Sequence, residues 1–265
     1  MGGTALVRFS VDRFCCHWDH AWVDFTDDDV AALYDLTNPW DADHWPSDRF
    51  YNGLVAAAGS TLDVGCGTGQ MLHAARDRGH VGRLVGLDPD VAALGRARRR
   101  ADIEWVEGRA ADIAWHREFD LATMTGHAFQ CLLSDQEVQV SLAAIRGALR
   151  NGGHFAFETR HPQARAWEQW AVGDSGDIAF SAGRVLRMRY GIEVRGDIVD
   201  TTEVTSLVDG TVLREDTGSL RFLDVGPLNV FLAESGFDVE AQYGDWKRGP
   251  VTPESKEIIT IARAA

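Results

Sequence analysis

The residues with the clearest capacity for chemistry lie in one short run, Thr61-Leu-Asp-Val-Gly-Cys-Gly-Thr-Gly-Gln70. Apolar residues around Asp63 predict a buried strand, and three glycines then predict a tight loop that leads into a helix. These glycines are Gly65, Gly67 and Gly69. Free N–H groups at a helix N-terminus bind ligands, and glycine lets a ligand approach the backbone closely. The run therefore predicts a ligand-binding loop between a strand and a helix.

The carboxylate of Asp63 narrows the kind of ligand. A dinucleotide fingerprint is G-x-G-x-x-G, with a pyrophosphate at the helix N-terminus. Here the spacing is G-x-G-x-G, and Asp63 stands two residues before Gly65. A carboxylate repels a pyrophosphate and attracts an ammonium group. The pattern favours a ligand with a cationic end and no phosphate, and S-adenosylmethionine is such a ligand.

The segment from Asp63 to Gly69 resembles the first motif of the class I, Rossmann-like S-adenosylmethionine-dependent methyltransferases, small-molecule type. The resemblance is strong over about residues 50–160 and looser after them. Four further predicted strands follow in the order that the family requires. They are Arg83–Asp88, Ile103–Glu107, Phe119–Met124 and Gly152–Glu158.

The resemblance assigns cofactor contacts to several of these residues. Asp63 would hold the methionine amine, and Asp88, at a strand end after the glycine loop, would accept from the ribose hydroxyls. Asp112 would face the adenine amino group, with a backbone donor from Ala111 beside it. Thr125 is also predicted to be one of the cofactor-binding residues. Asp63 and Asp112 each have an alternative reading as a helix-capping acid.

Methyl transfer asks mainly for positioning, because the sulfonium is already a good methyl donor. The acceptor atom must lie about 3 Å from the methyl group with water excluded, so no catalytic triad is expected. The acceptor should lie beyond the carboxyl ends of the fourth and fifth strands. His127 there is the candidate base, since imidazole titrates near neutrality; the alternative is local packing. Arg160 is a candidate clamp for an acceptor carboxylate or phosphate, or a partner of Glu158 or Asp224.

Aromatic residues are candidates for the acceptor pocket. Tyr34 and Trp40 precede the core and can close over a sulfonium by cation–π attraction, or pack the N-terminal helices. Phe129 can floor the pocket or belong to the core. Trp167, in a helix-like segment after the fifth strand, is a candidate lid or core residue. The predicted substrate-binding group is therefore these four aromatic residues with Arg160.

The elements that must position these residues alternate between strand and helix up to about residue 158. This alternation predicts a parallel sheet with helices on both faces. Three alternating runs then predict an antiparallel meander, at residues 184–194, 198–207 and 211–223. The predicted class is α/β: a seven-stranded, mostly parallel, doubly wound sheet with an antiparallel insertion after strand five. The resemblance implies that its last strand is antiparallel.

These patterns divide the chain into four predicted units. An N-terminal helical cap or lid takes residues 1–50, and the cofactor-binding core takes residues 51–160. The antiparallel insertion, which would roof the substrate, takes residues 161–225, and residues 226–265 complete the core sheet. A roof of this kind favours a small acceptor.

Composition limits the possible partners. The chain has 265 residues, with 26 Lys and Arg against 40 Asp and Glu, for a net charge of −14. This charge opposes nucleic-acid binding, and the basic run Arg96–Arg100 fits a solvated helix end better. No apolar run approaches a membrane span. Four cysteines without a C-x-x-C pair favour a reducing cytoplasm. Cys16-His-Trp-Asp-His20 lacks a distant ligand cluster, so no metal is expected.

The function predicted from these observations is methyl transfer from S-adenosylmethionine to an N, O or C atom of a small molecule, with S-adenosylhomocysteine as product. The resemblance points to bacterial secondary metabolism. Three alternatives stay open: a cofactor-using enzyme without an external acceptor, which would release methylthioadenosine; a protein or RNA methyltransferase; and a binding module. The sequence leaves open whether the chain is a monomer or a homodimer.

Overall fold

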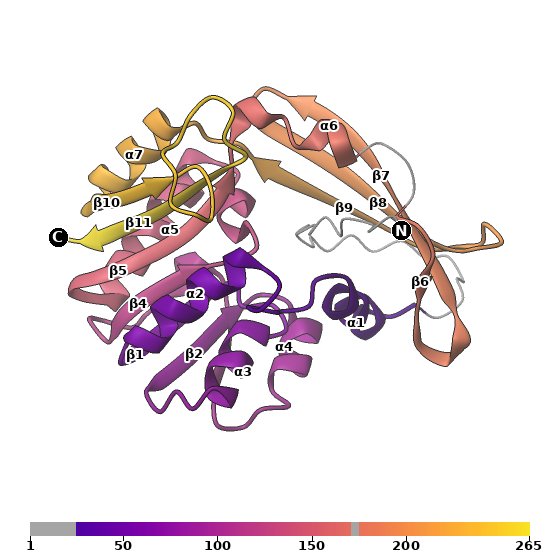
Figure 1. Cartoon of the computed structure of the whole chain (residues 1–265), viewed down its shortest axis with the longest axis horizontal. Coiled ribbons are helices and arrows are strands. Elements are labelled where there is room, and N and C mark those ends of the chain that lie inside the picture. Colours follow the sequence, from indigo (N-terminus) through magenta and orange to yellow (C-terminus); the bar gives the residue numbers. More distant parts are fainter. Residues whose placement is uncertain (1–24, 171–174) are drawn as a thin grey trace.

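The computed structural model describes residues 25–170 and 175–265, and Figure 1 shows the arrangement of their helices and strands. The main sheet has seven strands in the order β10-β11-β5-β4-β1-β2-β3. Their bounds are β1 Ser60–Val64, β2 Arg83–Asp88, β3 Glu104–Glu107, β4 Phe119–Met124, β5 Leu149–Arg160, β10 Phe237–Tyr243 and β11 Glu257–Ala264. The strands β1 to β5 pair in parallel, and β11 pairs antiparallel with both neighbours. The predicted fold class is confirmed.

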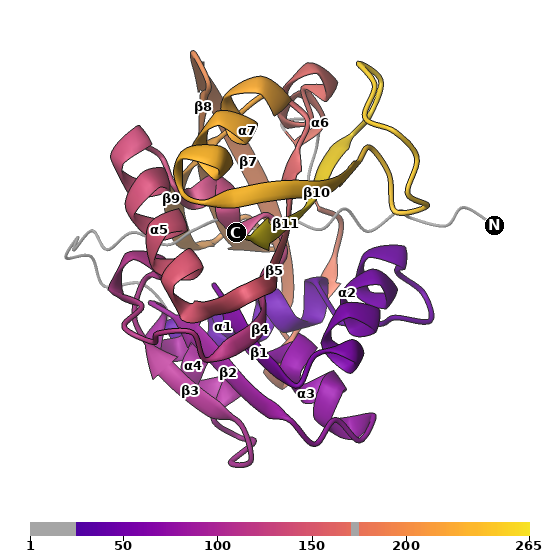
Figure 2. The same cartoon turned by 90° about the vertical axis from the view of Figure 1, so that its left-hand side faces the viewer.

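Helices cover both faces of this sheet, as Figure 2 shows. The helices are α1 Asp27–Thr37, α2 Pro46–Ala57, α3 Gln70–Asp77, α4 Val91–Ala97, α5 Asp135–Ala148, α6 Trp167–Trp170 and α7 Val225–Glu234. One core cluster joins α5 and α7 to the sheet through residues such as Leu142, Leu228 and Phe155. A second cluster joins α2 and α3 to the other face through Tyr51 and Leu72. Burial on both faces explains why every residue of β1 is buried.

The antiparallel insertion forms a separate sheet, which we call the roof. Its order is β6-β7-β8-β9, with bounds β6 Ile178–Ala179, β7 Val185–Arg195, β8 Ile198–Leu207 and β9 Val212–Arg221. The roof extends away from the main sheet, and α1 lies beneath it (Figure 1). Phe25 and Leu33 pack against Leu186, Met188 and Leu213 on the roof, so apolar burial fixes α1 to it.

Helix α1 begins at Asp27, because Thr26 caps it in a capping box with Asp29. Helix α4 ends at Ala97, with Arg96 in its last turn and Arg98 at its C-cap, and the other two arginines of the basic run follow directly. The run therefore lies at a helix end, as the sequence predicted. The Cys16–His20 run lies outside the described residues.

Within the described ranges, no helix is long and apolar enough to cross a membrane.

Candidate functional site

The loop from Gly65 to Gly69, which we call the cofactor loop, needs its glycines for different reasons. All three have positive φ, at 74°, 55° and 78° in chain order. A Cβ on Gly65 would lie 2.9 Å from the Cβ of Ala128, and one on Gly69 would lie 2.4 Å from the ring of Trp105. A Cβ on Gly67 would meet no atom within 4 Å. Close packing therefore accounts for the outer glycines, and the open side of the loop lies at Gly67.

Asp88 holds this loop from the end of β2. The N–H of Gly67 donates to its Oδ2 at 2.6 Å, and the N–H of Asp90 donates to its Oδ1 at 2.8 Å. Each carboxylate oxygen has a further lone pair. The Asp88 carboxylate lies where β2 ends beside the cofactor loop, the position that binds ribose hydroxyls in dinucleotide folds. These residues fit a nucleoside with no phosphate.

Asp63 lies at the centre of the sheet, where only 1% of it is exposed. The hydroxyl of Thr123 on the neighbouring strand β4 donates to its Oδ1 at 2.8 Å. Burial raises the pKa of Asp63 to about 7, a value that includes the lowering effect of the Thr123 hydrogen bond and the raising effect of the charges of Asp88 and Glu158. A cation beside Asp63 would reverse this shift, so the site favours a positively charged group.

Cofactor affinity should therefore depend on pH through Asp63. The free protein holds a proton on this carboxyl up to a pKa of about 7, and a bound ammonium group would expel it. Affinity for S-adenosylhomocysteine should then fall by up to about tenfold for each pH unit below 7, and level off above it. Calorimetric titration between about pH 5.5 and 7.5 measures this slope. Asp63→Asn should flatten it, and an unchanged slope in that variant would assign the effect to another group.

The predicted adenine contacts lie in the 3-10 turn Ala110–Asp112. The N–H of Arg109 donates to Oδ2 of Asp112 at 2.9 Å, so the capping alternative is present. Ala111 and Asp112 are both exposed, and Thr125 is partly buried just after β4. The capping bond occupies one oxygen of Asp112, and the adenine contact stays a prediction.

His127 stands in a loop of unusual backbone shape after β4. Its φ is 68° and that of Gly126 is 67°. A non-glycine residue with positive φ is uncommon, although histidine adopts it more readily than most. The N–H of His127 donates to Oε1 of Glu158 at 3.2 Å, and its Nε2 lies 2.9 Å from Oε2 of Glu257. Two carboxylates therefore fix this imidazole and its backbone.

Three residues of this cluster were missed in the sequence, namely Tyr51, Glu158 as a functional group, and Glu257. The Tyr51 hydroxyl on α2 donates to Oε2 of Glu158. Burial raises the pKa of Glu158, while the charge of His127 and the Tyr51 bond oppose the rise. Burial and the Glu158 charge raise the pKa of Tyr51, which therefore stays protonated and donates. The only signal in the sequence was the position of both glutamates at strand ends.

Arg160 is 5% exposed at the end of β5. Its Nη1 donates to Oε1 of Gln130 at 3.1 Å, and its guanidinium lies 4.9 Å from the ring centre of Trp170. No carboxylate of the described residues forms an ion pair with it, so the alternative pairing with Glu158 or Asp224 is wrong. Asp224 instead caps α7. Burial lowers the pKa of Arg160, and its role as an acceptor clamp stays a prediction.

The four predicted aromatic residues separate into two groups. The hydroxyl of Tyr34 would lie 3.6 Å from a Cβ on Gly126, so the structure brings Tyr34 to the loop of His127. Phe129 is 2% exposed and stacks on Phe157 in the core, with ring centres 4.5 Å apart. The other two also pack against neighbours: Trp40 bonds Asn52 through Nε1 at 3.2 Å, and Trp167 contacts Phe222 at 4.6 Å between ring centres. Packing is thus the first role of these three.

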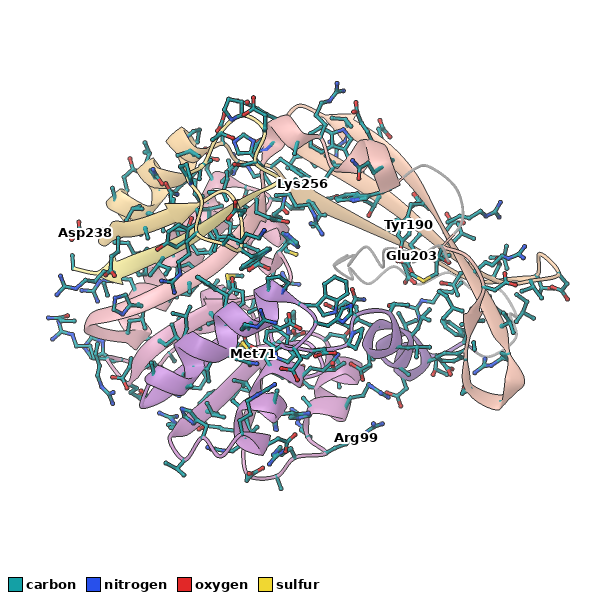
Figure 3. All side chains as sticks on the ribbon, viewed as in Figure 1. Met71, Arg99, Tyr190, Glu203, Asp238 and Lys256 are labelled. Atoms are coloured by element: carbon teal, nitrogen blue, oxygen red, sulfur yellow. The ribbon has the colours of Figure 1, made fainter. Side chains whose placement is uncertain are left out.

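The roof adds a polar pair on the side that packs on α1. Tyr190 and Glu203 are register partners on β7 and β8, and both are labelled in Figure 3. Tyr190 also belongs to the apolar cluster that holds Phe25 and Leu33. Burial and the charge of Glu203 raise the pKa of Tyr190. The roof therefore presents a tyrosine hydroxyl and a carboxylate on the face that packs against α1.

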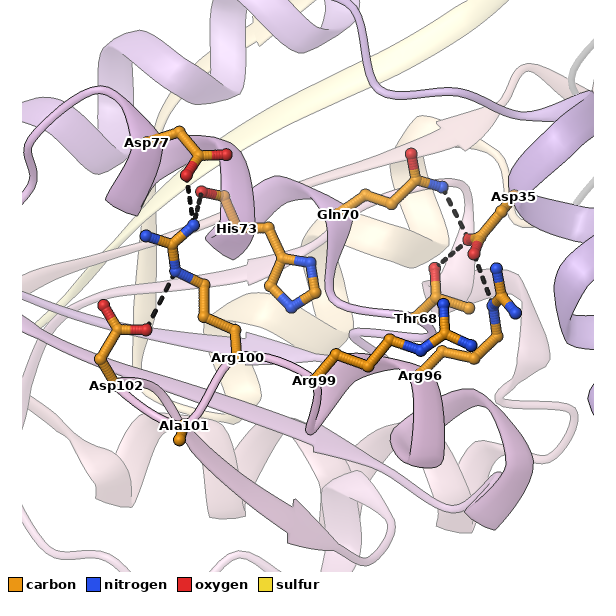
Figure 4. A pocket seen from close by; sticks show the side chains of 10 residues that line it. All are labelled: Asp35, Thr68, Gln70, His73, Asp77, Arg96, Arg99, Arg100, Ala101 and Asp102. Atoms are coloured by element: carbon orange, nitrogen blue, oxygen red, sulfur yellow. Dashed lines mark hydrogen bonds and ion pairs between the residues drawn. The ribbon is translucent and has the colours of Figure 1, made fainter.

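A groove of roughly 670 Å³ lies between α3 and α4 (Figure 4). It is lined by Asp35, Thr68, Gln70, His73, Asp77, Arg96, Arg99, Arg100, Ala101 and Asp102. Neither His127 nor Asp63 lines it, so this groove is separate from the acceptor side of the sheet. It meets the cofactor loop at one end only, through Thr68.

Comparisons with known proteins agree with this geometry. A family model described as a methyltransferase domain matches residues 61–153. Cypemycin N-terminal methyltransferase from Streptomyces sp is 27% identical over 221 residues, which cover 79% of this chain and 88% of that protein. A 2-phytyl-1,4-naphtoquinone methyltransferase from Thermosynechococcus vestitus is 31% identical over 151 residues, covering 53% and 66%.

A solved structure shows the same fold. CalS10, an amino pentose methyltransferase from Micromonospora echinaspora that is involved in calicheamicin biosynthesis, was solved with S-adenosylmethionine bound. It aligns with a TM-score of 0.67 and 20% identity, over 93% of this chain and all of that one.

Proposed function

We propose that this chain, a class I S-adenosylmethionine-dependent methyltransferase, methylates an amino nitrogen of a small molecule. The observation that carries the proposal is the contact of 2.9 Å between His127 and Glu257, with Glu158 beside it, at the carboxyl ends of β4 and β5. S-adenosylmethionine supplies a sulfonium methyl group for in-line displacement. The residues of this chain must bind the acceptor and free its lone pair.

The charges of the site suit an amine. An amine is protonated near neutral pH and has no lone pair to attack with until a base removes the proton. Because a carboxylate only accepts hydrogen bonds, the contact with Glu257 places a proton on Nε2 of His127. The Nδ1 lone pair is then the one that accepts the ammonium proton. The negative charges of Glu158 and Glu257 stabilise both the ammonium group of the incoming acceptor and the imidazolium that forms when His127 takes its proton.

The relatives support an amine acceptor by their names. One is named for methylation of an N-terminus and another for an amino pentose, and both acceptors carry an amino group. The third is named for a quinone, so the names alone leave the acceptor open. We propose nitrogen as the acceptor atom because His127 lies beside two glutamates in this site.

The setting that we propose is bacterial secondary metabolism in the cytoplasm. The calicheamicin enzyme, whose fold this chain shares, supports the metabolic setting. Four cysteines without a C-x-x-C pair suit a reducing compartment.

A panel of acceptors tests the proposed function. The protein is incubated with S-adenosylmethionine and amino sugars, short peptides with free N-termini, matched hydroxyl compounds, or a naphthoquinone. With amines we expect S-adenosylhomocysteine and an acceptor that has gained a methyl group, both detected by mass spectrometry. The rates should be at least about tenfold higher than with the hydroxyl compounds, because an amine pairs with the polar groups of the site and a hydroxyl compound leaves some of them unpaired. Equal or faster methylation of a hydroxyl or quinone would overturn the amine assignment. Methylthioadenosine formed without any acceptor would instead indicate the cofactor-only reaction.

A further inference from the structure

The carboxylate of Asp35 joins helix α1 to the cofactor loop, as Figure 4 shows. The hydroxyl of Thr68 donates to its Oδ1 at 2.5 Å, and Nε2 of Gln70 donates to the same atom at 3.0 Å. Nε of Arg96, on α4, lies 2.6 Å from its Oδ2. The side chains of Asp35 and Arg96 are only 23% and 19% exposed, so solvent screens this ion pair less than a surface pair. One side chain thus connects α1, the cofactor loop, α3 and α4.

Two aspartates hold consecutive residues of the cofactor loop from opposite elements. Asp88, at the end of β2, accepts from the backbone N–H of Gly67. Asp35, on α1, accepts from the side chain of Thr68. The first contact attaches the cofactor loop to the main sheet. The second attaches it to α1, so the position of the loop depends on the position of that helix.

The other end of α1 is fixed to the roof. Arg214 on β9 lies 2.7 Å from Asp27, and Arg184 lies 3.0 Å from Asp29. Leu33, which is 2% exposed, packs against the roof on the same helix. Helix α1 has 11 residues, so it is a short rigid body with one end on the roof and the other on the cofactor loop (Figure 1).

We propose that Asp35 is a positioning residue that couples occupancy of the cofactor loop to the placement of α1 and the roof. A ligand that orders the loop strengthens the contact between Thr68 and Asp35, and α1 transmits this order to the roof through its apolar and charged contacts. The acceptor side is then completed in the presence of cofactor. This inference rests on the cofactor and is independent of which atom of the acceptor is methylated.

The test compares Asp35→Asn with Asp77→Asn. Asp77 lines the far end of the same groove and pairs with Arg100, so its variant also removes an aspartate–arginine contact but leaves the cofactor loop untouched. We expect Asp35→Asn to weaken S-adenosylhomocysteine binding about tenfold, the loss of one charged hydrogen bond, by calorimetric titration. The KM for S-adenosylmethionine should rise similarly, and kcat should fall as well, because saturating cofactor no longer completes the acceptor side. Asp77→Asn should match the wild type.

Hydrogen exchange tests the coupling itself. In the wild type, S-adenosylhomocysteine should protect amides of α1 and of the roof strands that contact it, and Asp35→Asn should lose that protection at saturating ligand. Unchanged affinity and unchanged protection in Asp35→Asn would overturn the proposal. If Asp35→Asn fails to fold, Thr68→Val, which keeps the contact of Asp35 with Arg96, replaces it under the same criteria. A wild type that binds no S-adenosylhomocysteine would refute the cofactor, which is a separate failure.

Discussion

His127→Asn is expected to lower kcat for an amine acceptor by a factor of roughly 100 to 1,000, the usual contribution of a positioned general base. Asparagine tolerates positive φ, so the loop can keep the backbone that places residue 127 at φ 68°. The backbone N–H that donates to Glu158 is kept as well. The variant therefore removes the proton acceptor with little change of shape, and affinity for S-adenosylhomocysteine should stay within about twofold.

The chain contains a matched control for this variant. His154 also pairs through Nε2 with a glutamate, Glu240, at 3.0 Å, but it lies on an exposed part of the sheet away from the carboxyl ends. His154→Asn should leave kcat unchanged. Equal turnover in His127→Asn and the wild type would remove His127 as the base.

Local patterns were enough to predict the main sheet and the cofactor loop. The strand before the cofactor loop and the loop itself are both recognised from consecutive residues, the apolar run around Asp63 and the glycines that follow it within the ten residues Thr61–Gln70. Alternation likewise predicted β8 with its observed bounds, Ile198–Leu207. Such signals are available because a strand or a tight turn is set by consecutive residues.

The partners of the site residues could not be predicted in this way. Glu257 is 130 positions from His127, and Tyr51 is 107 positions from Glu158. No periodicity links such positions, because β11 returns antiparallel beside β5 and brings Glu257 opposite Arg160. The environment of Arg160 was missed for the same reason, since Gln130 and Trp170 come from segments before and after its strand.

Asp88→Ala is expected to weaken S-adenosylhomocysteine binding by about 3 kcal/mol, or roughly 150-fold, the cost of losing charged hydrogen bonds and leaving buried donors unpaired. The variant loses the acceptor for the ribose hydroxyls. It also leaves the N–H of Gly67 without the carboxylate that now accepts from it at 2.6 Å, so the cofactor loop loses its attachment to β2. Both losses act on binding, so calorimetric titration of the purified variant is the direct measurement.

Asp90→Ala separates this effect from a general loss of stability. Asp90 caps α4 two residues later and accepts from the N–H groups of Ala92 and Ala93. It should lower the melting temperature, since an N-cap contributes about 1 kcal/mol, and leave cofactor affinity nearly unchanged. If Asp88→Ala and Asp90→Ala weakened binding equally, the role of Asp88 would be structural. A specific loss in Asp88→Ala would place the nucleoside at the crossing of β2 and the cofactor loop, because there one carboxylate serves both the ligand and the backbone that cradles it.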